Sequence, residues 1–302
     1  MKRIVSVSLG TSKRDYSYTL NILGENYHIE RIGSNGSFNN AIRLIKELDG
    51  KIDAFGIGGI DLFLQTGSRK YILRDALKLK KAAKNTPLYD GSKYKYTFER
   101  NIIYKLMEDG VVDFKNKSIL VTSALDRYGM TEALEKCGGK IIIGDMLFAL
   151  NCNIPIYSLS TLNKMAMILL PIVSRLPFRM IYPTGGRQFE NKNRFNNYYI
   201  NAEIIAGDFH YIKRYMPMDL KNKIIITNTV TKEDIIQLKT RGVKLLVTTT
   251  PKLGERSFGT NVMEALIETI INNSKFVHKK ISYEDVYRTV GLEPRIEHFI
   301  KL

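Results

Sequence analysis

The chain has 302 residues, of which 44% are apolar and 25% charged, and its formal net charge is +16. This length allows a large core and two domains, and the composition excludes an intrinsically disordered chain. The longest apolar run, residues 165–173, is too short to cross a bilayer, so no membrane partner is expected. Two cysteines exclude a disulfide scaffold, and no cleavage site follows the first strand-like residues, so the expected location is the cytoplasm.

The positive charge has two interpretations, because it would attract either nucleic acid or small anionic metabolites. The basic residues are interspersed with acids, and the one dense run, residues 78–84, is typical of a solvated helix face. We therefore expect a small anionic substrate rather than nucleic acid as the partner. The composition leaves a homo-oligomer open.

The first part of the chain predicts a smaller α/β domain over residues 1–115, on the substrate side of the protein. Helical spacing of apolar residues indicates a helix that Ser37 caps and Gly50 ends. Strands and a hairpin precede it, and a strand and two helices follow. The expected strands are 3–9, 18–23, 27–32 and 52–57, and the expected helices are 37–48, 71–84 and 98–107.

The second part predicts a larger domain over residues 116–275. Its apolar runs are continuous rather than alternating, which is typical of parallel strands buried on both faces. Six strands with connecting helices indicate a doubly wound, mainly parallel Rossmann-like sheet, and residues 276–302 are expected to form a helical tail packed on the body. The expected strands are 119–122, 141–144, 179–182, 203–206, 224–227 and 245–248, and the expected helices are 131–137, 159–174, 209–216, 232–240, 260–271 and 283–299.

Residues 119–145 have the pattern of the first strand–helix–strand unit of a nucleotide-binding domain. Residues 122–127 read TSALDR where the glycine fingerprint is expected, so Thr122 and Ser123 would bind phosphate through hydroxyls and the helix N-terminus. Asp145 lies at the usual distance for the acid that holds the adenosine ribose, which favours NAD over NADP. Its alternative role is a helix N-cap. Arg127 would add to the phosphate site or attract the 2′-phosphate of NADP.

The residues that end or follow the other strands are also polar or small. Ligands bind at the carboxyl ends of parallel strands, where the strand order reverses. We therefore expect Gly207, Asp208, Asn228 and Thr248 to meet Thr122 in one crevice that holds the cofactor.

Three side chains are candidates for proton transfer. Lys13 and Asp61 follow strands of the first domain and would face the nicotinamide, where a lysine near a carboxylate stabilises a developing alkoxide. His210 begins a helix beside Asp208 and would give or take a proton, although a structural role is the alternative. With four histidines and two cysteines, no closely spaced metal motif is present.

Five segments carry a family resemblance over nearly the whole chain: RIVSVSLGTSKRD, IDAFGIGGIDL, ILVTSALDRYGMTEAL, IAGDFHYIKRYMP and VTTTPKLGERSFGTNVMEAL. The chain resembles a bacterial family known as quinate 5-dehydrogenase. The resemblance implies NAD(P)-linked oxidation of quinate to a 3-dehydro product. The segment NTVTK at residues 228–232 departs from the Asn-x-Thr-x-Pro-x-Lys motif that supplies a catalytic lysine in quinate and shikimate dehydrogenases.

Two functions follow from these observations. The first is an NAD(P)-dependent oxidoreductase that acts on a small, quinate-like hydroxy acid, with NAD as the favoured cofactor. The alternative is a protein that binds a nucleotide or a phosphorylated metabolite without redox chemistry, because the glycine fingerprint is missing and hydroxyl-rich and basic loops are abundant.

Overall fold

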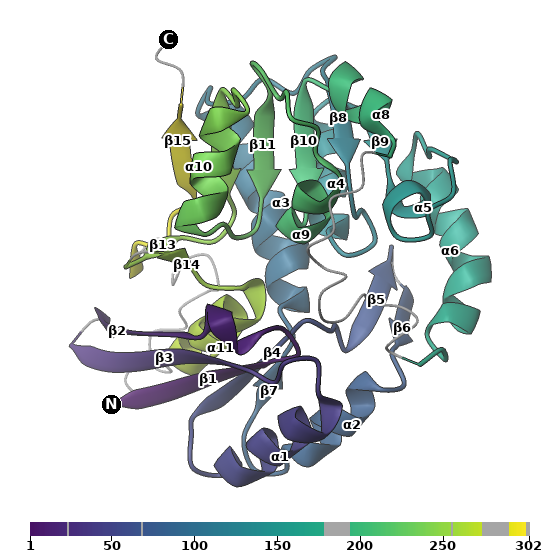
Figure 1. Cartoon of the computed structure of the whole chain (residues 1–302). Helices are drawn as coiled ribbons and strands as arrows, with labels where there is room; N and C mark the ends of the chain where they lie inside the picture. The colour runs from purple at the N-terminus through teal and green to yellow at the C-terminus, as the bar shows by residue number, and fades with distance from the viewer. Residues whose placement is uncertain (23, 68, 178–193, 255, 274–289, 300–302) are drawn as a thin grey trace.

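The computed structural model describes the chain except for residues 23, 68, 178–193, 255, 274–289 and 300–302. The expected strand 179–182 and the first residues of the expected helix 283–299 lie outside the described residues. The rest forms two α/β units, each a mainly parallel sheet with its own helices, which lie one above the other in Figure 1. We call these two units layers. The predicted α/β class with a mainly parallel sheet is therefore confirmed.

The first sheet has the strand order β2-β3-β1-β4-β7. Strands β3, β1, β4 and β7 are parallel, and the edge strand β2 is antiparallel to β3. Alternation along β1 sends Ile4 to one face and Val5 to the other, so both faces are apolar. The bounds are β1 Lys2–Ser8, β2 Tyr16–Ile22, β3 Glu25–Gly33, β4 Ala54–Gly58 and β7 Leu88–Tyr89.

Helices α1 (Phe38–Leu48) and α2 (Ala76–Ala82) cover the face of Val5. Ser37 caps α1 as expected, with its side chain accepting the N–H of Asn40. The expected helix 71–84 is wrong at its start, because strand β6 (Arg69–Ile72) pairs with β5 (Phe63–Thr66) in a hairpin. A short 3-10 turn, η1 (Ser12–Arg14), follows β1.

The second sheet has the order β15-β12-β11-β10-β8-β9, parallel except for the edge strand β15. Its central strands are mostly apolar and buried on both faces, as in β12, Leu245–Thr248, where all four residues are buried. Strand β15 replaces the expected helix over residues 295–298 and lies in the second sheet. The other bounds are β8 Ser118–Val121, β9 Lys140–Ile143, β10 Ile204–Gly207, β11 Ile224–Thr227 and β15 Arg295–His298.

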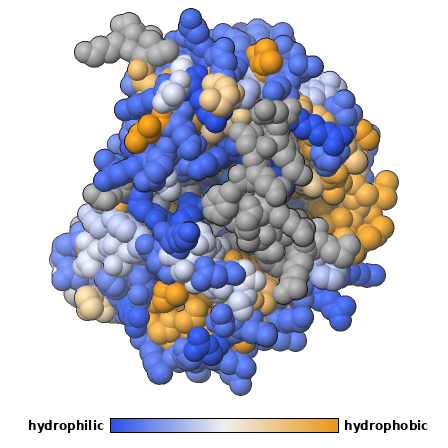
Figure 2. All heavy atoms as spheres, viewed as in Figure 1, coloured by the Kyte–Doolittle hydropathy of each residue, from blue (hydrophilic) through white to orange (hydrophobic). Residues whose placement is uncertain are grey.

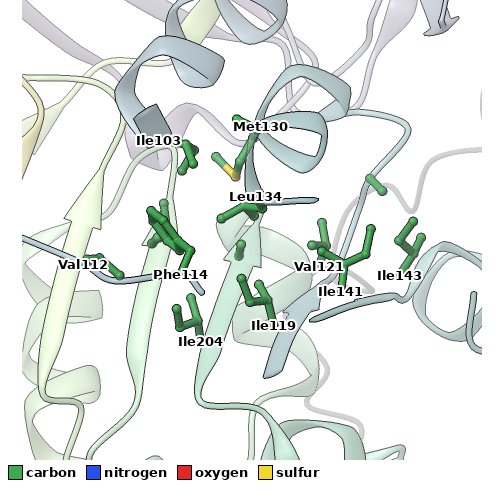
Figure 3. Packing of buried hydrophobic residues seen from close by; sticks show 14 of the residues in the cluster. Ile103, Val112, Phe114, Ile119, Val121, Met130, Leu134, Ile141, Ile143 and Ile204 are labelled. Atoms are coloured by element: carbon green, nitrogen blue, oxygen red, sulfur yellow. The ribbon is translucent and has the colours of Figure 1, made fainter. Parts of the chain in front are cut away.

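Helices cover both faces of this sheet. One face packs against α4 (Tyr128–Lys136) and α6 (Leu159–Val173), with Phe114 and Leu134 in the cluster that Figure 3 draws. The helices of the other face are α5 Asp145–Phe148, α8 Asn196–Asn201, α9 Phe209–Tyr215 and α10 Lys232–Thr240. Figure 2 shows a mostly hydrophilic face with an apolar region on the right, where Figure 1 draws α6. No helix in the described part of the chain is long and apolar enough to cross a membrane.

Two helices cross the expected boundary between the domains. Helix α3 (Ser92–Glu108) contributes Phe98 to the core of the first sheet and Ile103 to the core of the second. Helix α11 (Thr260–Ile271) was expected in the second domain, but Val262 and Leu266 pack against the first sheet. The middle of α3 therefore lies where the two layers meet, which we call the seam.

Glu264 joins these two helices and makes stability depend on pH. Its carboxylate accepts the N–H groups of Lys93 (3.0 Å) and Tyr94 (3.3 Å), and burial raises its pKa to about 7. Because the native state then holds this proton more tightly than the unfolded chain, the contribution of Glu264 to stability is largest below pH 4.5 and is lost as the pH rises through 7. Through this group, the free energy of unfolding of the wild type should fall by on the order of 2–3 kcal/mol between pH 4.5 and 8. Glu264→Gln keeps an acceptor oxygen but does not titrate, so we expect this fall to be absent.

Urea unfolding at several pH values measures this loss, with Glu47→Gln on the exposed side of α1 as the control. Parallel pH curves for wild type and Glu264→Gln would contradict the assignment.

Candidate functional site

The carboxyl ends of strands from both sheets meet at the seam. In the first sheet, β1 lies between β3 and β4, and in the second, β8 lies between β9 and β10, so the strand order reverses at β1 and β8. The turn after β1 contacts the turn after β10 through Arg14 and His210, whose side-chain nitrogens are 3.0 Å apart. Both sheets thus direct their ligand-binding edges into one region.

A buried lysine links the two layers at this seam. The Nζ of Lys95, on α3, is 2.5 Å from a carboxylate oxygen of Asp61 and 2.5 Å from one of Asp126. Asp61 follows β4 in the first layer, and Asp126 follows β8 in the second. One ammonium group therefore holds the two loops together.

A buried arginine continues this network into the second layer. The guanidinium group of Arg127 is 2% exposed and donates to Glu99 (2.7 Å) and Asp208 (2.8 Å), and its Nε lies 3.1 Å from Asp126. Glu99 is wholly buried on α3, one turn after Lys95, and also accepts the hydroxyl of Thr249 at 2.9 Å. Charges in such surroundings are stable only as a paired set.

Burial and neighbouring charges separate the pKa values of these carboxyl groups. Burial raises the pKa of Asp61 to about 7, although Lys95 opposes the shift. Burial alone would also raise the pKa of Asp126, but Arg127 and Lys95 hold it below its ordinary value. A carboxyl group that titrates near neutral pH beside one that stays ionised is typical of a functional site.

A small pocket opens beside Lys95. Aromatic rings of Tyr96 and Tyr128, stacked with centroids 6.3 Å apart, form part of its wall. The volume of this cavity is about 30 Å³, whereas pockets for drug-sized ligands have roughly 300–1,000 Å³. The lining residues are Asp61, Phe63, Leu64, Gln65, Ser92, Lys95, Tyr96, Leu125, Asp126, Tyr128 and Gly129.

The structure brings the predicted strand-end residues together, but bonds them largely to one another. Thr122 donates to the carbonyl of Ala206 beside Gly207, and Ser123 accepts the N–H of Asp208 at 3.1 Å. Asn228 donates to Asp208 at 2.8 Å. Thr248 is fully buried, and its hydroxyl donates to the carbonyl of Thr250. These groups build the edge of the seam.

Asp145 does not lie where the ribose interpretation requires. Its two carboxylate oxygens accept the backbone N–H groups of Ala124 (2.8 Å) and Leu125 (3.0 Å), in the turn between β8 and α4. Burial raises its pKa to about 6, against the effect of those two bonds. The protein's own carboxylate thus fills the anion position that a cofactor phosphate was expected to occupy, and the N-cap alternative is also wrong, because Asp145 begins α5 without a capping bond.

The other expected site residues divide between the seam and the surface. Asp61 is in the buried network, and His210 contacts Arg14 at the opening of the seam. Lys13 is exposed on η1, and its backbone N–H donates to the hydroxyl of Thr11. Arg127 was expected to bind phosphate, but three carboxylates of the protein already surround it.

Lys95 and Glu99 are candidate site residues that the sequence analysis missed. They lie on the same stripe of α3 as Ile102, Ile103 and Leu106, all of them buried. Charged residues on an apolar stripe indicate buried ionic contacts, which Lys95 makes with Asp61 and Asp126, and Glu99 with Arg127. Across the described residues, no group of His, Cys, Asp and Glu has the arrangement of a metal site.

Comparisons with known proteins give two family matches. A family model described as "Domain of unknown function (DUF8754)" matches residues 93–299, and "Domain of unknown function (DUF8753)" matches residues 3–90. A search of curated proteins found no match.

Solved structures resemble the chain at low identity. GanP, a glucose-galactose binding protein from Geobacillus stearothermophilus, is 11% identical, with 99% of this chain and 97% of that chain covered and a TM-score of 0.41. The substrate-binding protein of a sugar ABC transport system from Bordetella parapertussis 12822 is 11% identical, with coverage of 92% and 81% and a TM-score of 0.35. L-tryptophan dehydrogenase from Nostoc punctiforme is 10% identical, with coverage of 96% and 80% and a TM-score of 0.35.

The expectation of an NAD(P)-dependent oxidoreductase acting on a quinate-like acid is wrong. The site geometry argues against it, because Asp145 and Arg127, both expected to hold the cofactor, are bonded within the protein.

Proposed function

The chain belongs, through residues 93–299, to the family described as domain of unknown function (DUF8754), and for this member we propose that the seam binds a small, hydroxyl-rich metabolite without redox chemistry. The observation that carries the proposal is the pocket beside Lys95. It combines charged hydrogen-bonding groups with aromatic walls at the edge where the carboxyl ends of both sheets meet.

The lining suits hydroxyl groups. The carboxylates of Asp61 and Asp126 can accept hydrogen bonds from the hydroxyl groups of a ligand. The ammonium group of Lys95 can donate to the oxygens of those hydroxyl groups. The rings of Tyr96 and Tyr128 offer flat apolar surface to the carbon skeleton of the same ligand. A few fixed polar groups within apolar walls are what specific small-molecule sites require.

The size of the cavity sets a condition on binding. A volume of about 30 Å³ admits water or a single hydroxyl group, so a whole metabolite must move the two layers apart at the seam. Binding between layers that separate and close is a common mode of ligand capture by two-layer α/β proteins. The buried ion pairs of Lys95 would then open and close with the ligand.

A thermal-shift panel tests the proposal with monosaccharides, polyols, their phosphates, NAD and NADP. A ligand at one hundred times its Kd stabilises the native state by about 2.7 kcal/mol, which corresponds to a rise in Tm of roughly 4 °C for a chain of this size. We expect such a rise from at least one hydroxylated compound and none from NAD or NADP.

Tyr96→Leu is expected to weaken that binding about tenfold, because it removes one aromatic wall. Tyr104→Leu makes the same substitution on the same helix, against the core of the second sheet and away from the pocket lining, and should leave the affinity unchanged. The proposal is wrong if no compound raises Tm or if both variants lose affinity equally.

A further inference from the structure

Three arginines gather at the opening of the seam, outside the pocket of Lys95. Arg14 lies on η1, Arg31 on β3, and Arg256 on β14 (Arg256–Ser257), which pairs with β13 (Lys252–Leu253). The guanidinium carbon of Arg256 lies 5.2 Å from the ring centroid of Tyr16, and Tyr16 is the cross-strand partner of Arg31. The hairpin β13–β14 thus brings Arg256 to the edge strand of the first sheet, as Figure 1 shows at the left of the seam.

Few negative charges balance this cluster. Asp15 forms an ion pair with Arg31 at 2.8 Å. Within the described residues, no carboxylate lies within ion-pair distance of Arg14 or Arg256, although Glu233 exerts a weaker field on Arg256. Among the described residues, these three guanidinium groups and the one paired carboxylate sum to a charge of about +2, because arginine stays protonated in proteins.

The guanidinium groups lie close enough to destabilise one another. Burial, and then the neighbouring charge of Arg14, lower the pKa of Arg31 to about 10, although Asp15 opposes the shift. Burial and then Arg14 lower the pKa of Arg256 in the same way. In the part of the chain that the structure describes, the buried Nε of Arg14 has no hydrogen-bond partner. An unsatisfied buried donor beside like charges costs stability, and an anion would remove both costs.

The cluster is held in position from both layers. Arg31 donates to the hydroxyl of Ser8 (2.9 Å) and to the carbonyl of Thr11 (3.0 Å) in the turn after β1. Arg14 donates to the ring Nε2 of His210 at 3.0 Å, so this nitrogen carries no proton. Crowding by protein atoms lowers the pKa of His210, and Arg14 adds to the effect, which Asp208 opposes. His210 begins α9 of the second layer.

We propose that Arg14, Arg31 and Arg256, with His210 beside them, form a binding site for a phosphate group. A phosphate dianion matches the surplus of two positive charges, and its oxygens accept from several planar guanidinium groups at once. Because Arg14 contacts His210 of the second layer, the bound anion would lie where the two layers meet.

The phosphate site also bears on the metabolite of the proposed function. A continuous series of contacts joins the cluster to the pocket. Arg14 contacts the ring of His210, and the backbone N–H of His210 donates to Asp208 at 2.9 Å. Asp208 in turn pairs with Arg127, which also contacts Asp126 in the pocket lining. The inference that the metabolite is phosphorylated rests on the proposed function, whereas binding of inorganic phosphate does not.

Calorimetric titration of the full chain with inorganic phosphate, at constant ionic strength set with chloride, tests the site. We expect saturable binding to wild type and an affinity at least tenfold lower in Arg14→Gln and in Arg256→Gln. Arg43→Gln removes the same charge from the exposed side of α1 and should bind as wild type does. Without phosphate, Arg256→Gln should unfold at the same or a higher temperature than wild type, since it relieves repulsion.

Two results would overturn the phosphate site: no saturable heat with wild type, or equal affinity in Arg256→Gln and Arg43→Gln. The two proposals fail separately. Phosphate binding without any response to the metabolite panel refutes the proposed function alone. A response to unphosphorylated sugars or polyols, without phosphate binding, refutes the phosphate site alone.

Discussion

Arg127→Met should lower the free energy of unfolding by about 3–5 kcal/mol, because removal of one partner leaves buried charges unpaired. Glu99 is wholly buried, and Arg127 donates to it and to Asp208. The Oε2 of Glu99 already lacks a hydrogen-bond donor among the described residues, so little else can compensate for the loss. Urea unfolding followed by circular dichroism measures the change.

Two further variants separate the lost ion pairs from the lost side chain. Arg43→Met makes the same substitution in the exposed pair with Glu47, where double-mutant cycles of such pairs give at most about 0.5 kcal/mol. Glu99→Gln added to Arg127→Met should recover part of the stability, since the unpaired charge is then absent. A loss below about 1 kcal/mol for Arg127→Met, or no recovery in the double variant, would show that the network is not a paired set.

Asp145→Ala should lower the free energy of unfolding by about 2–6 kcal/mol, since each buried N–H left without an acceptor costs about 1–3 kcal/mol. The two N–H groups are those of Ala124 and Leu125. Asp145→Asn keeps one acceptor oxygen and should lose about half as much. Thermal unfolding of the three proteins at pH 7 provides the comparison.

The pH dependence of the free energy of unfolding gives an independent test of the role of Asp145. Its pKa is raised from 3.8 to about 6, so its contribution to native stability is largest below pH 3.8 and falls as the pH rises through 6. Asp145→Asn should flatten this fall. If both Asp145 variants were as stable as wild type, the carboxylate would be free for a ligand and the interpretation as an internal anion would fail.

Much of the fold could be predicted from periodicity. The bounds of α10 and α11 agree with the expected helices, and Thr231 caps α10 through a capping box with Asp234. Such elements depend on neighbouring residues, which the sequence displays. Strand β15 could not be predicted in this way, because four residues after Pro294 become a strand only by pairing with β12.

The position of the site could be predicted, but not which of its side chains bind one another. The rule that ligands bind at the ends of parallel strands located Ser123, Asp208 and Asn228. It could not reveal that Arg127 pairs with Glu99, 28 positions away, or that Asp145 bonds to a neighbouring turn. An acid after the second strand gives the same pattern in sequence whether it accepts from a ribose or from the backbone.

Hydrogen–deuterium exchange, with and without the strongest stabiliser of the metabolite panel, tests most directly whether the ligand lies between the layers. We predict slower exchange together in residues 8–16, from the end of β1 to the start of β2, and in residues 206–212, from the end of β10 into α9, since these segments meet through Arg14 and His210. The exposed helix α1 serves as the reference that should not change. Slower exchange confined to one layer, or found mainly in α1, would contradict a ligand held at the seam.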